Sequence, residues 1–302
     1  MRIGYPCINL RIGCTSSATF RLKSYTEERL VSKIESNLDC LQKILEFNVD
    51  NQILNFRITS DLVPFASHPI CKYDWMSHFA GEFARIGRYA KKEGIRLSMH
   101  PGQYTVLNSP HERVLMNSIV ELEYHASVLD LLKADRTAKI QIHVGGVYGN
   151  KEAAMSRFLV NYDELDRRVS RRLVVENDEK SYTVNDLLML NELAQIPIVL
   201  DTLHHEANDS GMKLEQAIEL SSTTWNGGSP AIVDYSSQAP EGRAGKHAET
   251  IDIIHFQRFL EQSVGYDFDL MLEIKDKESS AIKAIGVAKS DSRFIPKPML
   301  TV

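Results

Sequence analysis

Short apolar runs rich in β-branched residues alternate along the chain with longer segments whose apolar residues recur every three or four positions. Runs such as 173–175 and 198–200 are continuously apolar, which is typical of parallel strands covered on both faces. The pattern predicts eight strands, at residues 2–4, 53–58, 95–99, 139–143, 172–176, 197–201, 230–234 and 269–273.

Helical stripes lie between these strands. Asp74 is expected to cap one helix that Gly94 stops, and Ser109-Pro110-His111-Glu112 has the form of a capping box at the start of another. Eight strands alternating with helices predict an α/β fold, a (β/α)8 TIM barrel, with a doubly wound open sheet as the alternative. We expect one catalytic domain over residues 1–278 and a C-terminal tail over 279–302.

Potential metal ligands stand at or just after the ends of six of the predicted strands. They are His100, His143, Glu176, Asp201 with His204 beyond it, Asp234 and Glu273. All strand ends of one kind open onto the same face of a parallel barrel, so these side chains should converge in one bowl. Taken alone, His143 is equally well explained as a hydrogen-bonded histidine of the core.

The carboxylates are harder to explain as structure. Glu176, Asp201, Asp234 and Glu273 each close an apolar run, and a buried charge needs a cation or another partner. Imidazole and carboxylate ligands without thiolates suit Zn, Mn, Fe or Co, and there are enough of them for two or three ions. Centres of this kind activate water and stabilise both oxygens of a phosphoryl displacement.

The loops after the strands offer further candidate groups. Gln103 and Tyr104 follow His100 on a tight turn, where an exposed aromatic beside an amide suits stacking on bases or wedging between them. The alternative is that Tyr104 packs on the rim of the barrel. His68 lies in the long loop after the second predicted strand, on the same face, and Arg243 and Lys246 precede His247, where each cation either meets a phosphate or is solvated.

Composition sets the class of protein. A chain of 302 residues with 43% apolar and 25% charged residues is long enough to bury a large core. Its formal charge of -5 does not by itself suggest a nucleic-acid partner. The four cysteines form no C-x-x-C pair and are expected to be reduced thiols, and neither a membrane span nor a signal peptide is indicated, so we expect an intracellular, cytoplasmic protein.

Six short motifs occur in order on the predicted strand ends and loops. They are Gly4-Tyr5-Pro6-Cys7-Ile8-Asn9-Leu10, Pro64-Phe65-Ala66-Ser67-His68-Pro69, Leu97-Ser98-Met99-His100-Pro101-Gly102-Gln103-Tyr104, Glu176-Asn177-Asp178, Asp201-Thr202-Leu203-His204-His205 and Ser237-Gln238. Together they resemble the UV damage endonuclease family, from Arg2 to about Glu278. That family is a TIM-barrel relative of endonuclease IV that nicks double-stranded DNA immediately 5′ of UV photoproducts, including cyclobutane dimers and 6-4 products.

The resemblance implies a cluster of two or three divalent ions, usually Mn2+, and no membrane or obligate protein partner. It implies metal ligation by His100, His143, Glu176, Asp201, His204, His247 and Glu273, and we expect Asp234 to bind metal as well. It also implies catalytic roles at the lesion side for Tyr5 and His68 beside Glu176, and DNA contacts for Asn9, Gln103 and Tyr104. Bound ions would offset the acidic charge of the chain at the place where a phosphate must lie.

One departure from the family pattern concerns the seventh strand. The chain has Ile232-Val233-Asp234 where the family has Lys-x-His. A carboxylate can replace imidazole as a ligand, but Ile232 cannot replace a lysine, so occupancy of the third metal is open. Two other functions fit the ligand set: a metal-dependent sugar isomerase or epimerase on the same barrel, and a lesion-binding protein without catalysis.

Overall fold

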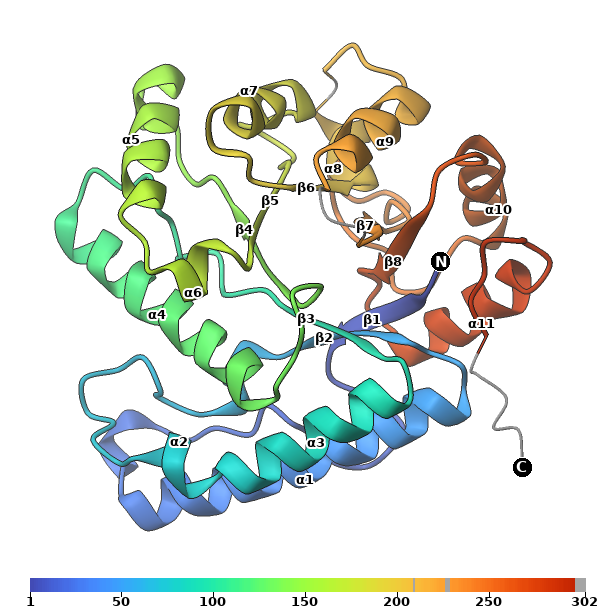
Figure 1. Cartoon of the computed structure of the whole chain (residues 1–302). Coiled ribbons are helices and arrows are strands. Elements are labelled where there is room, and N and C mark those ends of the chain that lie inside the picture. The colour runs from blue at the N-terminus through green and yellow to red at the C-terminus, as the bar shows by residue number, and fades with distance from the viewer. Residues whose placement is uncertain (209, 226–228, 297–302) are drawn as a thin grey trace.

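The computed structural model describes residues 1–296 except 209 and 226–228. Eight parallel strands form a closed barrel in the order of the sequence (Figure 1). They are β1 (Ile3–Cys7), β2 (Asn55–Ile58), β3 (Arg96–Met99), β4 (Lys139–His143), β5 (Leu173–Glu176), β6 (Ile198–Asp201), β7 (Ala231–Tyr235) and β8 (Phe268–Leu272). The barrel closes where β8 pairs with β1, with Leu270 opposite Ile3. The predicted (β/α)8 barrel is confirmed, and the open sheet is excluded.

Helices surround the strands in Figure 1. The longer ones are α1 (Glu27–Asp50), α3 (Ala80–Lys92), α4 (Glu112–Leu131), α5 (Lys151–Asp163), α7 (Val184–Ala194), α9 (Leu214–Thr223), α10 (Ile253–Gln262) and α11 (Glu278–Ala288). Short helices α2 (Trp75–His78), α6 (Arg167–Ser170) and α8 (Thr202–Ala207), and the 3-10 turns η1 (Leu22–Ser24) and η2 (Ser60–Leu62), lie in the connections. Within the described residues, no helix combines the length and apolar character that a membrane crossing requires.

Two predicted helices differ from the structure. Asp74 caps α2 as expected, but the backbone leaves helical geometry at Phe79 (ψ 11°), so the expected single helix is divided into α2 and α3. The capping box at Ser109 is wrong. Helix α4 begins at Glu112 after an extended His111, and the Ser109 hydroxyl accepts a hydrogen bond from the His111 N–H in a turn that precedes the helix.

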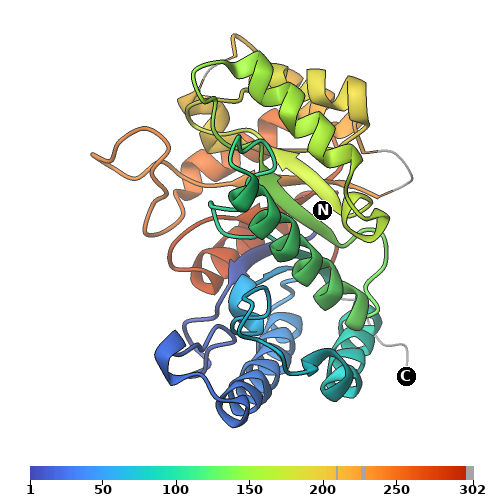
Figure 2. The same ribbon diagram turned by 90° about the vertical axis from the view of Figure 1, so that its left-hand side faces the viewer.

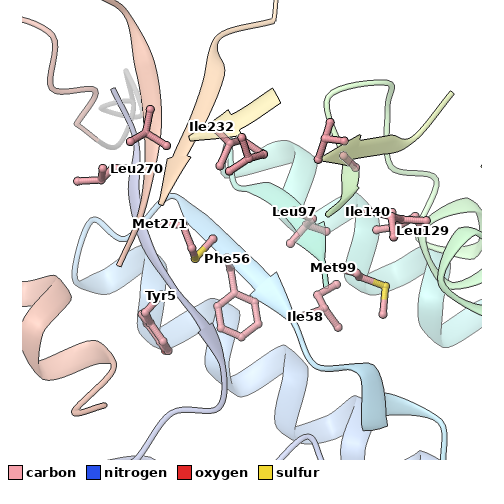
Figure 3. Close-up of a cluster of buried hydrophobic side chains, with 14 of the residues drawn as sticks. Tyr5, Phe56, Ile58, Leu97, Met99, Leu129, Ile140, Ile232, Leu270 and Met271 are labelled. Atoms are coloured by element: carbon pink, nitrogen blue, oxygen red, sulfur yellow. The ribbon is translucent and has the colours of Figure 1, made fainter. Parts of the chain in front are cut away.

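The core fills the space inside the strands and between strands and helices. Figure 3 shows part of it, with Tyr5, Phe56, Ile58, Leu97, Met99, Leu129, Ile140, Ile232, Leu270 and Met271 labelled. Tyr5 packs edge-on against Phe56, with ring centroids 5.4 Å apart. Ile232 is fully buried in this cluster, so the position where the family pattern has lysine is part of an apolar core here.

The segment expected as a C-terminal tail begins instead as a helix of the barrel. Helix α11 buries Ala281, Ala284, Ile285 and Ala288, a stripe with helical spacing, and packs against β1 and α10. The boundary expected at residue 278 is therefore corrected, because α11 completes the ring of helices after β8. Residues 297–302 of the expected tail lie outside the described residues.

The expectation of four reduced cysteines is wrong for two of them. The loop between β1 and α1 turns back over the helix, which brings the Cα atoms of Cys14 and Cys40 to 5.9 Å, and the two residues form a disulfide. Sequence spacing gave no sign of this pairing because the loop path decides it. Cys7 and Cys71 are free and partly buried.

We expect loss of this disulfide to destabilise the fold. The bond closes a loop with a sequence separation of 26, and a cross-link of that size stabilises a folded protein by about 3 kcal/mol, mainly by restricting the unfolded chain. Urea unfolding of the doubly substituted Cys14→Ser/Cys40→Ser protein should show a midpoint below that of the wild type. Cys71→Ser is the matched control. Equal midpoints for the double variant and the control would contradict this expectation.

Candidate metal centre

The eight predicted metal ligands converge at the carboxyl ends of the strands. His143 and Glu176 end β4 and β5, His100 and Glu273 directly follow β3 and β8, and Asp201 and Asp234 lie in β6 and β7. His204 lies on α8, and His247 comes from the long loop between β7 and α10, which projects from the body of the protein in Figure 2. The closed parallel barrel therefore gathers residues from distant parts of the sequence on one face.

Glu176 lies at the centre of this face and is almost completely buried. Its Oε2 is 3.2 Å from His100 Nε2 and 3.5 Å from His143 Nε2. Its Oε1 is 3.2 Å from His204 Nδ1. One carboxylate therefore faces three imidazoles from three separate elements, the geometry expected of a bridging ligand.

The side chains form three overlapping groups whose ligand atoms lie within 4.8 Å of one another. These groups are His100, His143 and Glu176; then Asp201, His204 and His247; and then Glu176, Asp201 and Asp234. The first two groups offer nitrogen and oxygen ligand atoms, and the third offers carboxylate oxygens alone. This donor set suits Zn, Mn, Fe or Co more than a structural thiolate zinc site.

Asp201 and His204 are held together by the start of α8. Asp201 Oδ1 caps this helix by accepting a hydrogen bond of 2.7 Å from the His204 N–H, and its Oδ2 lies 3.7 Å from His204 Nδ1. Among the described residues, the buried Oδ2 has no hydrogen-bond partner. An unpaired buried carboxylate oxygen aimed at an imidazole is what a metal ligand looks like without its ion, so the residues fit a divalent cation.

Sequence reasoning missed three residues that hold the ligands in place. Asn177 pairs its side chain with the Asp201 backbone, and its carbonyl oxygen lies 3.1 Å from His204 Nδ1. Gln141 donates to Glu176 Oε2 and to Asp234 Oδ2, each at 2.6 Å. Arg57 forms ion pairs with Asp234 and Glu273. Arg57 and Gln141 were each visible as a polar residue at an interior position of an apolar strand.

Burial and neighbouring charges move the pKa values of these groups in opposite directions. Burial alone would raise the pKa of Glu176, but His143, His100 and His204 outweigh it and hold that pKa well below its ordinary value. Burial raises the pKa of Asp201 well above its usual range, although His204 opposes it. Burial lowers the pKa of His204, but Asp201 and Glu176 outweigh this and raise it to about 11. The site is therefore short of positive charge, and the carboxylates around His204 favour its protonated form.

Two residues expected near the reaction do not face the metal centre. Tyr5 is fully buried behind β1, where its hydroxyl donates to Asn48 on α1 at 2.7 Å and accepts from the Asn9 side chain at 2.8 Å. Asn9 Oδ1 in turn accepts the N–H groups of Arg11 and Ile12. Tyr5 and Asn9 therefore help to order the loop after β1, because alternation along β1 turns Tyr5 towards α1. The catalytic role expected for Tyr5 and the DNA contact expected for Asn9 stay predictions.

His68 is exposed in the loop after β2, where it packs near Phe65 and its Nδ1 accepts the N–H of Ile70. These contacts are local, and none of them reaches the carboxylates of the metal centre. His125, in contrast, is fully buried on α4, and burial lowers its pKa to about 4.

Gln103 and Tyr104 project from the turn after β3. Both are exposed, and Tyr104 is 83% accessible to solvent. They line a hollow of about 690 Å3 that reaches His143 and is also bordered by Tyr148 and Lys180. A second hollow, of about 260 Å3, is bordered by residues that include His100, His247, Glu273, Arg57 and Lys277. The centre is therefore open to a ligand that extends to either side.

The fold and these side chains define a class: a (β/α)8 barrel with a candidate site for more than one divalent metal ion at the carboxyl ends of its strands. The profile of the family described as UV-endonuclease UvdE matches residues 1–291. This chain belongs to the UvdE family.

Individual relatives agree with this assignment. The UV DNA damage endonuclease of Clostridium perfringens (strain 13 / Type A) is 40% identical over 98% of this chain and 72% of its own length. That of Bacillus cereus (strain G9842) is 32% identical over 94% and 93%. A solved structure described as SacUVDE superposes with a TM-score of 0.92 and 43% identity, covering 96% of this chain and 98% of that one.

A more distant likeness concerns the fold alone. Endonuclease IV from Thermus thermophilus superposes with a TM-score of 0.61 over 96% of this chain and 98% of its own, but with 16% identity. D-psicose 3-epimerase from Clostridium cellulolyticum superposes with a TM-score of 0.56 over 84% of this chain and 93% of its own, with 13% identity. The barrel is therefore shared with proteins named for different chemistries, and the site has to decide the function.

Proposed function

We propose that this chain is a metal-dependent endonuclease that nicks double-stranded DNA immediately 5′ of UV photoproducts. The observation that carries the proposal is the position of Glu176, whose carboxylate faces His100, His143 and His204 in a chain of the UvdE family. The expected products are a 3′ hydroxyl and a 5′ phosphate.

His100, His143 and Glu176 would hold one divalent ion, and Asp201, His204 and His247 a second, with Mn2+ the expected metal. Such ions supply an activated water and positive charge beside the departing 3′ oxygen. Glu176 also faces the second group. Its Oε2 lies next to His100 of its own group, and its Oε1 lies next to His204 of the other. Gln141 and Asn177 keep the ligands oriented by hydrogen bonds to Glu176 and Asp201.

Gln103 and Tyr104 would probe the duplex. They project from the turn that directly follows His100, so a side chain inserted into the base stack would leave the backbone close to the metal centre. A UV photoproduct stacks poorly, and extruding it costs less free energy than extruding an intact base pair. The pair would then fill the space that the lesion leaves, while the adjoining hollow at His143 accommodates displaced DNA.

The test is incubation of the full-length protein and Mn2+ with a UV-irradiated duplex labelled at one 5′ end. Nicks immediately 5′ of dipyrimidine sites, with ends that a ligase accepts after the lesion is removed, would support the proposal. An unirradiated duplex and an EDTA-treated reaction are the controls. Absence of lesion-dependent nicking would contradict the proposal, and the sugar isomerase and the non-catalytic lesion-binding protein both predict that absence.

Tyr104→Ala should weaken lesion recognition without affecting the fold. Stacking of one base on an aromatic ring is worth about 1–3 kcal/mol, so nicking at subsaturating protein should fall about 5- to 150-fold. The thermal midpoint should not change, because Tyr104 is 83% exposed. Tyr104→Phe, which keeps the ring, should retain most of the activity. Loss of activity in the Phe variant as large as in the Ala variant would show that stacking is not the role of this residue.

A further inference from the structure

Arg57 lies beneath the metal centre as a fully buried cation. It is the penultimate residue of β2, and only 2% of its surface is exposed. Its Nη2 donates to Asp234 Oδ1 at 2.9 Å, to Asp234 Oδ2 at 2.7 Å and to Gln141 Oε1 at 2.8 Å. Its Nη1 donates to Glu273. One guanidinium therefore faces two of the four carboxylates of the site.

These contacts engage both carboxylate oxygens of Asp234, a residue that a third metal ion would need as a ligand. Asp234 Oδ2 accepts from Arg57 and, at 2.6 Å, from Gln141, so both of its lone pairs are used. Oδ1 accepts a further hydrogen bond from Arg57. Of the three candidate ligand groups, only the one made of Glu176, Asp201 and Asp234 includes this engaged carboxylate.

The charge of Arg57 acts in the same direction. A divalent ion bound through Asp234 would lie next to a buried guanidinium, and repulsion between like charges is strong where water is excluded. Strand β7 itself offers no cation to pair with Asp234, because the residue two positions earlier is the apolar, buried Ile232. The guanidinium is thus the positive charge that keeps Asp234 buried.

We propose that the guanidinium of Arg57 takes the place of a third metal ion, so that this chain binds two divalent ions and uses Asp234 as an anchor for Arg57 rather than as a ligand. The two ions belong to the groups of His100, His143 and Glu176 and of Asp201, His204 and His247. This inference rests on the metal centre of the proposed function and makes Arg57 a positioning residue, which holds Asp234 and Glu273 without touching DNA.

The experiment counts metal ions in the absence of DNA. Full-length protein is freed of metal with EDTA, dialysed to equilibrium against Mn2+ and analysed for manganese per chain by mass spectrometry. The expected result for the wild type is two equivalents, and three would overturn the proposal. Arg57→Gln removes the charge and should admit a third equivalent. If it folds and still binds two, Arg57 is not the group that excludes the third ion.

Arg96→Gln is the matched control. Arg96 is also buried and pairs with a buried carboxylate, Asp269, at 3.0 Å, but it lies at the opposite end of the barrel, and its variant should bind two ions like the wild type. Circular dichroism establishes which variants fold. If Arg57→Gln does not fold, the doubly substituted Arg57→Gln/Asp234→Asn protein, which removes the pair, should bind two. Three equivalents in that protein would assign the third site to other ligands and overturn the proposal.

The metal count and the nicking assay test two separate proposals. A chain that binds two Mn2+ but never nicks irradiated DNA would contradict the proposed function and leave the role of Arg57 intact. A chain that nicks irradiated DNA but binds three Mn2+ would do the reverse.

Discussion

Glu176→Gln should lower the rate of nicking of UV-irradiated DNA by at least about 10²–10³-fold, because it weakens the binding of the ions whose positive charge would stabilise the departing oxygen. The amide has nearly the shape of the carboxylate but no negative charge. It would leave His100, His143 and His204 without the anion that all three face at 3.2–3.5 Å. The measurement is single-turnover nicking in Mn2+, beside DNA binding by the same protein.

The comparison variant for this substitution is Glu206→Gln. Glu206 lies on α8, close to the centre in sequence, but its partner is His255 at 3.5 Å and its side chain is 46% exposed. It should cleave at the wild-type rate. DNA binding by Glu176→Gln should be largely retained, because the exposed Tyr104 and Gln103 remain in place. Cleavage by Glu176→Gln at the wild-type rate would exclude the bridging role assigned to this carboxylate.

The barrel was predictable because its strands differ locally from everything between them. Runs such as 173–175 and 198–200 are too apolar and too short for surface helices, and the structure has strands β5 and β6 there. Helix ends were less predictable. At Phe79 and Ser109 the local signals allowed a continuous helix and a capping box, but the chain has to turn towards the next strand at those points.

The cluster of carboxylates and imidazoles at the strand ends was predictable for a different reason. A carboxylate that ends an apolar strand, such as Glu176 or Asp201, is costly to bury unless a cation or another partner compensates its charge. The barrel topology brings all such strand ends together. The direction in which each side chain faces was not available from motifs. Tyr5 lies within a family motif at the end of β1, yet it faces α1, because neighbouring residues of a strand face opposite sides.

Arg57 escaped prediction because a single cation in an apolar strand has no partner within reach in the sequence. Its partners Asp234 and Glu273 are 177 and 216 residues away, and only closure of the barrel brings them together. The Cys14–Cys40 disulfide was missed for the same reason on a smaller scale, since the path of one loop decides it. Long-range pairs of this kind change the chemistry of the site, because Arg57 alters the charge that metal ions have to neutralise.

Removal of divalent metal should lower the free energy of unfolding by about 5 kcal/mol. The reference is the protein in Mn2+ at a hundred times the dissociation constant, where each of two bound ions contributes about 2.7 kcal/mol by mass action. The structural reason is that Glu176 and Asp201 are almost completely buried, and Arg57 balances only the carboxylates of Asp234 and Glu273. Urea unfolding in Mn2+ and in EDTA measures the difference. Glu176→Gln should gain less from Mn2+ than the wild type, whereas Glu206→Gln should gain as much. Identical midpoints in Mn2+ and EDTA for the wild type would mean that the buried carboxylates are stabilised without metal. That result would contradict metal binding at this site.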